Sequence, residues 1–583
     1  MSAFLPQDDP NRADRDAALE SARRKYTFNY THISPLALVD SVPRVDEFSF
    51  SWLKLMGARV LTTIENETQL TRTSQFVEFL RSKHSWLSTL IVDGLELIGG
   101  LKGLVTDAIK LAGRHDATPD RPKSLDDYAR LFRRIGLPPI ARDYADDAAF
   151  AAMRVAGPNP VVLRAVDRLD DRFPLTDELF QEALPGDTLA AAAAEGRLFL
   201  ADYHLLANAE CGDYPDGQKY LHAPLAAFAL DRATRRLRPV AIQCKQTPGP
   251  ENPVFTPRDG YNWLIAKTIV EIADGNLHEA VTHLGLTHLL VEPFVVSTHR
   301  QLAPNHPLFL LLAPHFEGTL AINEASWRHL VADKGAVDKL LAGTINYSRG
   351  LAAHGLQAFS FAHSSLPVAL AERGVADADR LPEYPYRDDA LLHWEAIRDW
   401  VREYVALYYP ADADVAADTE LQAWGTEIGA ATGGRINGVG RCGAVAEVVE
   451  ALTRVIFTCS VQHAAVNFPQ YDLMSYAPNM PLAGYAPAPS SRRGATEQDY
   501  LNLLPPLDMA ELQMELGYML GSVYYTQLGG YPAGHFRDPR VAEPLARFRA
   551  RLADIGTTIA ARNTGRRPYE YLLPTSIPQS INV

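Results

Sequence analysis

The chain has 583 residues, of which 47% are hydrophobic and 22% are charged, and these are the proportions of a globular protein. Its net charge of -14, with no dominant basic patch, argues against nucleic acid as a partner. The chain has four scattered cysteines and no C-x-x-C pair, which excludes both a cysteine-based zinc framework and a disulfide scaffold.

Residues 1–40 are strongly charged and predict a helical or partly ordered arm ahead of one large domain, residues 41–583. The first residues lack the pattern of a signal peptide, and no apolar run reaches the roughly 18 residues that a spanning helix needs. We therefore expect a cytoplasmic protein.

Amphipathic patterns predict helices in four stretches of the chain: 85–113, 127–136, 176–196 and 388–408. The first of them is interpreted as a packed helix, with peripheral membrane contact or a cover over a channel mouth as the alternatives. Between the third and the fourth, residues 197–245 predict short strands joined by turns.

Three prolines, at 248, 250 and 253, separate these strands from a long helix that is predicted over 261–292. Two more long helices are predicted over 443–468 and 508–527, and an exposed loop over 486–494. The sequence thus predicts a mainly α fold, a large single helical domain with a minor β element.

Histidines gather in the predicted central helix. Six of the 17 lie between positions 278 and 315, and three of these, His278, His283 and His288, stand at five-residue intervals in an apolar stretch. Burying an imidazole costs free energy unless it gains a partner, and a metal ion can pair with several rings at once. The alternative is a set of core or capping histidines, each hydrogen-bonded to a backbone carbonyl.

The five-residue interval carries structural information. Side chains at i and i+5 point about 140° apart on an ideal α-helix, so they reach one ion only where a π-turn corrects the direction. His463 and Asn467, four residues apart, already share one helical face. Two helices presenting nitrogen and oxygen donors suit iron, manganese, zinc or copper, and an octahedral site of this kind favours iron or manganese.

The residues around these histidines resemble the lipoxygenase family. The similar segments are W-L-I-A-K-T-I-V-E-I-A-D-G-N-L-H-E-A-V-T-H-L-G-L-T-H-L-L-V-E-P-F, Q-H-A-A-V-N-F-P-Q-Y and P-Y-E-Y-L-L-P. They occur in the family's order, and the similarity runs from about residue 40 to 583 and is greatest with bacterial members. The resemblance implies a lipoxygenase-type catalytic domain without the family's N-terminal β-barrel domain.

By this resemblance one non-heme iron, rather than manganese, is bound by residues of the two histidine helices and by the C-terminal carboxylate. The implied ligands are His283, His288, His463, Asn467 and Val583. His278 is implied to be a structural neighbour, and the other histidines of the cluster, 299, 306 and 315, to serve in packing or around the ligands.

The resemblance also implies residues of the substrate cavity. Glu279 and Gln470 match positions that link the cavity to the iron, with a solvated face as the alternative for Glu279. Ser326 matches a position where alanine accompanies S products and glycine R products, so S is expected. Leu330 is implied to shield the reactive carbon, with a plain core leucine as the alternative. Leu340 and Leu341 match positions that bound the cavity, and Gly275 favours a deeper one. Ala325 replaces an arginine that tethers the fatty-acid carboxylate in some animal members.

The activity that follows is dioxygenation of polyunsaturated fatty acids of the linoleic or arachidonic type. Hydrogen is removed from a bis-allylic carbon and O2 is added, which gives a conjugated-diene hydroperoxide. Two alternatives remain open: a fatty-acid hydroperoxide isomerase with the same iron site, and a lipid-binding protein with a degenerate metal site. The fatty acid and O2 are the expected partners, and no protein partner is required.

Overall fold

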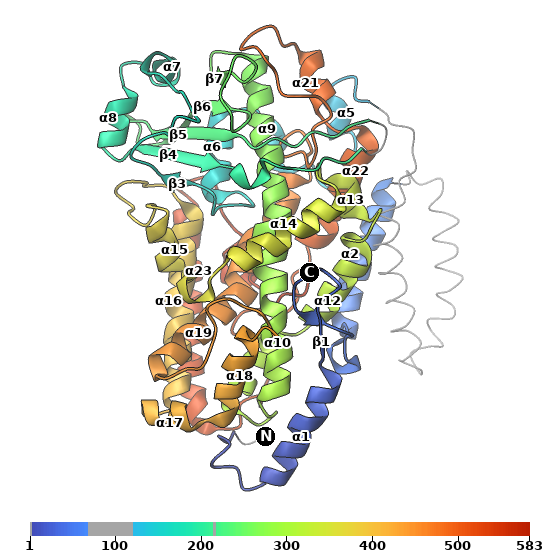
Figure 1. The fold of residues 1–583 in the computed structure, drawn as a ribbon, viewed down its shortest axis with the longest axis vertical. Coiled ribbons are helices and arrows are strands. Elements are labelled where there is room, and N and C mark those ends of the chain that lie inside the picture. The colour runs from blue at the N-terminus through green and yellow to red at the C-terminus, as the bar shows by residue number, and fades with distance from the viewer. Residues whose placement is uncertain (1–2, 68–120, 214–216) are drawn as a thin grey trace, which may run out of the picture.

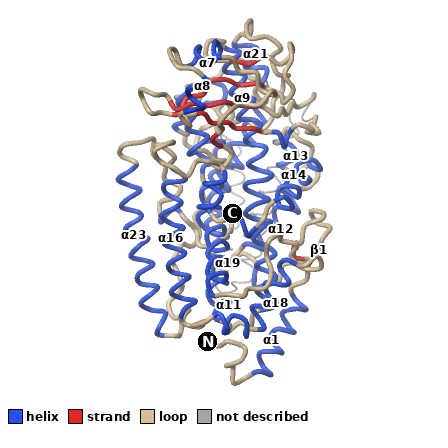
Figure 2. Tube along the Cα trace, turned by 60° about the vertical axis from the view of Figure 1, so that its left-hand side comes forward, coloured by secondary structure: helices blue, strands red, loops and turns tan. Residues whose placement is uncertain are grey.

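The computed structural model describes residues 3–67, 121–213 and 217–583. Within these ranges helices dominate, with a small sheet at one end of an elongated body (Figures 1 and 2). This confirms the mainly α fold with a minor β element. The predicted helix 85–113 lies outside the described residues.

A continuous helical run through the middle of the body organises the fold. It consists of α9 (Tyr261–Leu277), the π-helix η4 (His278–Leu289) and α10 (Leu290–Gln301). This run of 41 residues is long and apolar enough to cross a membrane, but its most apolar window is 89% buried inside the protein. The surrounding helices therefore provide the apolar environment, as expected for a core helix.

Longer helices surround this run on several sides (Figure 1). They are α14 (Ile345–Ala358), α16 (Pro385–Ala406), α18 (Thr419–Gly429), α19 (Val445–Phe457), α22 (Leu507–Gly521) and α23 (Ala542–Arg562). Shorter helices connect them: α11 (Pro307–Leu312), α12 (Thr319–Ala325), α13 (Ala336–Leu340), α15 (Leu366–Glu372), α17 (Asp412–Ala417) and α21 (Glu497–Leu503).

The sheet caps one end of the body and has five antiparallel strands in sequential order. They are β3 (Arg164–Ala165), β4 (Leu198–Asp202), β5 (Leu225–Leu230), β6 (Leu237–Gln243) and β7 (Val254–Phe255). Helices α7 (Asp177–Ala183) and α8 (Leu189–Ala194) cover one face, and α6 (Asp147–Ala156) covers the other, where Phe150 stacks on Phe228 at 5.6 Å between ring centroids. Because both faces are covered, every residue of β5 is buried and the strand reads as a continuous apolar run.

The N-terminal arm is fastened to the helical body. Its helix α1 (Arg12–Lys25) packs against α10, and buried Arg15 pairs with Glu420 of α18 at 2.5 Å. Two short strands, β1 (Phe28–Asn29) and β2 (Leu38–Val39), lead to α2 (Phe50–Glu67). The division of the chain at residue 40 stays a prediction.

Three predicted helices differ from the structure. The stretch 127–136 is helical only in α5 (Asp126–Ala129), because the buried Asn66 side chain accepts hydrogen bonds from the backbone N–H groups of residues 133, 134 and 135. The stretch 176–196 is divided into α7 and α8 at Gly186, whose φ of 81° lies in the left-handed region. The predicted helix 508–527 ends early, at Gly521.

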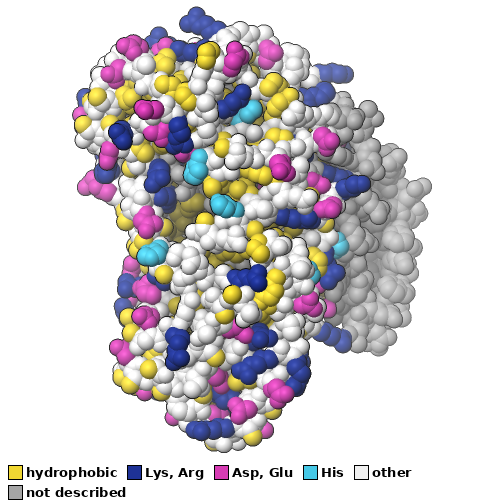
Figure 3. Space-filling model, in the orientation of Figure 1, with side chains coloured by type: hydrophobic (Ala, Val, Ile, Leu, Met, Phe, Trp, Pro, Cys, Tyr) yellow, Lys and Arg dark blue, Asp and Glu magenta, His cyan; other side chains and the backbone are white. Residues whose placement is uncertain are grey.

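The surface of the described part of the molecule carries charges of both signs. Figure 3 shows lysine and arginine side chains interspersed with acidic ones over the visible face, rather than collected in one basic patch.

Helices η4 and α14 approach each other closely through glycines. A Cβ atom added to Gly285 would lie 3.2 Å from the carbonyl oxygen of Ala352, and one added to Gly355 would lie 2.6 Å from Val281 Cγ1. The histidine-bearing helix is thus held against α14 at a distance that larger residues do not allow.

We predict that Gly355→Ala destabilises the protein, because the new methyl group overlaps Val281, a β-branched residue with little rotamer freedom. Overpacking of this kind costs about 1–3 kcal/mol. Gly350→Ala on the same helix is the matched control, since a Cβ there meets nothing within 4 Å, and it should be neutral or stabilising by up to about 1 kcal/mol. Thermal unfolding of both variants measures the difference, and equal melting temperatures would contradict the close contact.

Candidate metal centre and substrate cavity

The π-helix aligns the histidines that stand five residues apart. In a π-helix the backbone hydrogen bonds join residues i and i+5, so side chains at this interval lie above one another. His283 and His288 accordingly have ring centroids 5.0 Å apart, with their Nε2 atoms at 3.3 Å. The predicted local π geometry is confirmed.

A second interrupted helix brings the third ring. Helix α19 continues through the π-helix η8 (Thr458–Gln462) into α20 (His463–Asn467), and the His463 ring centroid lies 5.1 Å from that of His288. All three rings are buried, and one nitrogen from each lies within 4.8 Å of the others. The structure thus brings His463 beside His283, which lies 180 residues earlier in the sequence, and His288.

The hydrogen bonding of these rings leaves nitrogen atoms that a metal ion could bind. His288 Nδ1 donates to Asn323 Oδ1 at 2.8 Å, which leaves the Nε2 lone pair directed at the cluster. Neither ring nitrogen of fully buried His463 has a hydrogen-bond partner among the described residues. A buried polar atom without a partner is costly, and coordination to a metal would satisfy it.

Burial also keeps the rings neutral, which is the form that binds metals. Burial, together with repulsion from neighbouring His283, lowers the pKa of His288 to about 3. The pKa of His463 is likewise lowered well below its usual value by burial and by repulsion from the other two rings. The backbone of Val583 acts in the opposite direction on His463, since it lies beside this ring.

Of the two oxygen donors expected from the resemblance, Asn467 lies one helical turn after His463 and Val583 lines the cavity. Asn467 is buried one turn after His463, and its Oδ1 accepts from Gln470 Nε2 at 2.9 Å. Val583, only 3% exposed, lines the same cavity as His283 and His288.

The C-terminal tail is held in place along its backbone. Trp52 Nε1 donates to the carbonyl of Asn582 at 2.7 Å, and the Thr319 hydroxyl donates to the carbonyl of Ile581 at 2.9 Å. Chain ends usually fray, so these contacts fix an end that would otherwise move.

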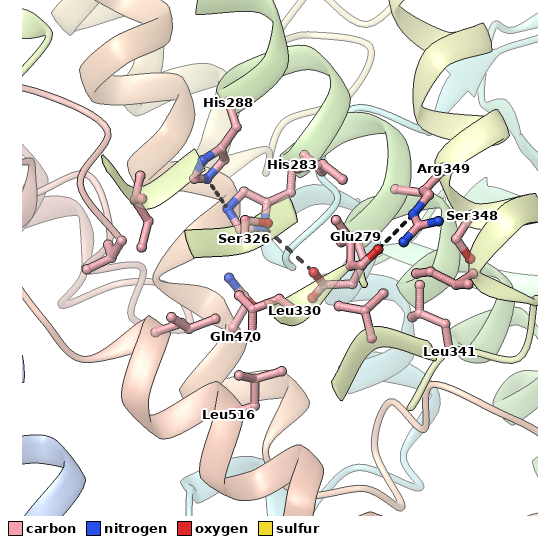
Figure 4. Close-up of a pocket in the computed structure, with 18 residues that line it drawn as sticks. Glu279, His283, His288, Ser326, Leu330, Leu341, Ser348, Arg349, Gln470 and Leu516 are labelled. Atoms are coloured by element: carbon pink, nitrogen blue, oxygen red, sulfur yellow. Dashed lines mark hydrogen bonds and ion pairs between the residues drawn. The ribbon is translucent and has the colours of Figure 1, made fainter. Parts of the chain in front are cut away.

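The cluster opens onto an apolar cavity of about 750 Å³ (Figure 4). Its lining is mostly aliphatic, as in sites that hold apolar ligands. Expected cavity residues that line it are Glu279, Gln470, Ser326, Leu330 and Leu341. A smaller cavity of about 370 Å³ adjoins it, and Leu340 lines this one.

Of the expected residues other than the metal ligands, Gly275 and His278 lie outside both linings. Gly275 packs against Leu482, and a Cβ atom there would lie 2.9 Å from Leu482 Cδ2. His278 Nε2 lies 2.9 Å from the carbonyl oxygen of Val466 and so ties η4 to α20. His306 and His315 are also bound elsewhere, to Asp418 and to Tyr531.

Glu279 lies between the cluster and the rest of the cavity. Its carboxyl oxygens are 3.5 Å from His278 Nδ1 and 3.7 Å from His283 Nδ1. Burial alone would raise the pKa of Glu279, but hydrogen bonding and attraction by these two histidines bring it below its usual value. The carboxylate therefore orients the two rings, in the way that outer ligands orient metal-binding histidines.

Sequence reasoning missed two features of the site. Asn323 Nδ2 donates to buried Glu292 at 2.7 Å, and Glu292 in turn accepts from the backbone N–H of Val39 at 2.6 Å, so a chain of hydrogen bonds joins β2 to His288. Ser348 and Arg349 of α14 line the cavity. No spacing rule relates these residues to the histidines, because only tertiary folding brings them together.

Comparisons with known proteins agree with this geometry. The family model described as Lipoxygenase matches residues 139–578. A Pseudomonas aeruginosa linoleate 9/13-lipoxygenase is 44% identical over 501 residues, which cover 82% of this chain and 73% of that protein. The human hydroperoxide isomerase ALOXE3 is 37% identical over 79% of this chain and 66% of its own length.

Solved structures show the same fold. The crystal structure of coral 8R-lipoxygenase superposes with a TM-score of 0.85 at 30% identity, covering 100% of this chain and 83% of the other. A lipoxygenase crystallised anaerobically in complex with arachidonate gives a TM-score of 0.85 at 29% identity, covering 100% and 84%. Taken with the histidine cluster and its apolar cavity, these matches show that the chain belongs to the lipoxygenase family, enzymes that dioxygenate fatty acids.

Proposed function

We propose that this protein is a non-heme iron dioxygenase of polyunsaturated fatty acids such as linoleic or arachidonic acid, and that it releases conjugated-diene hydroperoxides. The observation that carries the proposal is the cluster of three buried, neutral imidazoles at one end of an apolar cavity. The names of the relatives support the substrate class, since one acts on linoleate and one solved neighbour holds arachidonate.

We assign the ligands as His283, His288, His463, Asn467 and the α-carboxylate of Val583. Iron bound by them would supply the one-electron oxidation that activates the bis-allylic C–H bond. Three neutral rings and one neutral amide keep a ferrous ion accessible, while the single carboxylate favours the ferric state because anionic ligands stabilise higher charge.

The protein residues orient the metal ligands and keep water away from the reacting carbon. Asn323 and Glu279 orient the imidazole rings, and Gln470 links Asn467 to the cavity. The aliphatic lining excludes water from the reacting carbon and gives the acyl chain an apolar environment.

The test of the activity is conjugated-diene absorbance after purified, iron-assayed protein is mixed with linoleate in air. We expect a rise that requires O2. Conversion of an added fatty-acid hydroperoxide without O2-dependent diene formation would instead favour the isomerase activity. The human hydroperoxide isomerase is 37% identical to this chain. Iron-loaded protein that is inert in both assays, yet binds linoleate, would indicate a lipid-binding protein.

Loss of a single ligand should remove the metal. We predict that His288→Ala, and separately deletion of Val583, lower the iron content and reduce activity at least about 100-fold, more than the loss of an outer-shell partner costs. In the deletion variant the terminal carboxylate belongs to Asn582 and lies one residue, roughly 3.5 Å, short of the position of the Val583 carboxylate.

The matched controls are His299→Phe and Val583→Ile. His299 stacks on Tyr26 at 4.2 Å and lies outside the cluster, and isoleucine keeps the terminal carboxylate. Iron analysis and diene formation measure all four variants. Full iron content in His288→Ala, or a fully active deletion, would remove that residue from the ligand set.

We also propose S stereochemistry, because Ser326 is closer in size to alanine than to glycine. Ser326 begins the π-helix η6 (Ser326–Leu330) and lines the cavity together with Leu330. We predict that Ser326→Gly shifts the products toward R, since the smaller residue opens space for O2 beside the acyl chain. Chiral chromatography of the reduced products checks this, and an unchanged R:S ratio would show that Ser326 does not steer O2.

A further inference from the structure

Arg349 stands out among the residues that line the main cavity. It is the one lining residue with a permanent positive charge in the described part of the chain, and the remainder are mostly aliphatic. It extends from α14, whereas Ala325, at the position of the family's arginine, is uncharged and lies outside the lining. Figure 4 shows Arg349 on the far side of Glu279 from His288.

The guanidinium is positioned but incompletely paired. Its Nε donates to the carbonyl oxygen of Val331 at 2.7 Å, and Nη1 lies 3.1 Å from the carboxylate of Asp333. Nη2 has no hydrogen-bond partner among the described residues. The Val331 contact fixes the direction of the side chain, so a donor and its charge stay available to a ligand.

The surroundings of Arg349 place it where the cavity meets the surface. Its side chain is 25% exposed, and its partner Asp333 is 79% exposed. An exposed ion pair contributes little free energy, so Asp333 is readily replaced by another carboxylate. The adjacent Ser348 is 7% exposed, lines the cavity, and has no hydrogen-bond partner for its hydroxyl within the described residues.

The smaller adjoining cavity has no cationic side chain among its described lining residues. The smaller cavity shares Glu279, Val337, Leu341, Gln470 and Leu516 with the main one. Beyond these residues it is lined by the buried apolar residues Leu340, Met474 and Leu482 and by Gln513 and Gly517. A carboxylate placed there would lose its hydration without gaining a cation, whereas a methyl end loses nothing.

We propose that Arg349, assisted by the hydroxyl of Ser348, binds the carboxylate of the fatty acid at the cavity mouth, so that the acyl chain enters with its methyl end first. The inference rests on the proposed function and adds to it the orientation of the substrate. Asp333 occupies the guanidinium in the free enzyme and gives way to the ligand carboxylate.

The experiment compares linoleate with methyl linoleate, which has the same chain without the charge. We expect Arg349→Gln to raise KM for linoleate about tenfold, the size of one lost charge-assisted hydrogen bond, and to leave the kinetics with the ester near those of the wild type. Arg349→Lys should keep most of the preference for the acid. Asp333→Asn should lower KM for linoleate, because the competing carboxylate is gone.

Arg328→Gln is the matched control, since Arg328 is 48% exposed, pairs with Glu324 and lies outside the lining. Arg328→Gln should leave KM for linoleate and the kinetics with methyl linoleate unchanged. Equal losses for acid and ester in Arg349→Gln would overturn the proposal and show that the residue only supports the loop at Val331.

The position of oxygen on linoleate gives a second readout. If Arg349 anchors the carboxylate, the products of Arg349→Gln should contain the 9- and 13-hydroperoxides in a more even ratio than those of the wild type. An unchanged ratio would count against the proposed orientation. A wild-type protein inactive toward both lipids would refute the proposed function instead. Calorimetric binding of linoleate and methyl linoleate to the same variants would then still decide whether Arg349 holds the carboxylate.

Discussion

Burial of three imidazole rings at one point of the core is the constraint on which the rest of the structure depends. Each ring loses its hydration, and burial lowers the pKa of His288 to about 3, so the rings stay neutral. Neutral rings in apolar surroundings need partners, and an unpaired buried group costs about 1–3 kcal/mol. The outward nitrogen of His288 donates to Asn323 Oδ1, and that of His283 lies 3.7 Å from the Glu279 carboxylate, while one nitrogen of each ring faces the other two.

Elements from both ends of the chain meet at this point. The backbone of Val39, in the N-terminal arm, reaches His288 through Glu292 and Asn323. Val583 reaches His463 from the other end, held by Trp52 of α2. The metal centre therefore depends on contacts between parts of the chain that are distant in sequence, and the central helix alone cannot form it.

The sequence predicted the parts of the site that follow from local geometry. The five-residue interval of His283 and His288 required a π-turn, and the structure has one. The choice of these two rings over His278 came from the family resemblance, because spacing treats all three alike. The break at Gly186 was missed by the prediction of one helix over 176–196, although the Pro-Gly pair there is a turn signal.

Other features could not be predicted because they arise from distant contacts. Residues 131–136 have helical periodicity, but Asn66 takes their N–H groups from the helix. Arg349 sits in an ordinary polar stretch, Y-S-R-G, and becomes a cavity residue only when α14 packs on η4. Glu292 resembles any helical glutamate until folding places Val39 and Asn323 against it.

The π-helix also fixes the rotational register of the two α-helices that it joins. A π-turn closes a hydrogen bond over one residue more than an α-turn, so His278–Leu289 takes up extra residues without changing how α10 faces its neighbours. If the same residues wound as an α-helix, α10 would rotate, and the faces that it presents to α1 and α18 would turn away from them. The outer packing of α10 therefore acts as a torsional lock, which favours the π form over a more stable α-helix. A single-residue deletion in this segment would favour α winding, which keeps the contact of α10 with α1 but turns the histidines at the five-residue interval away from each other.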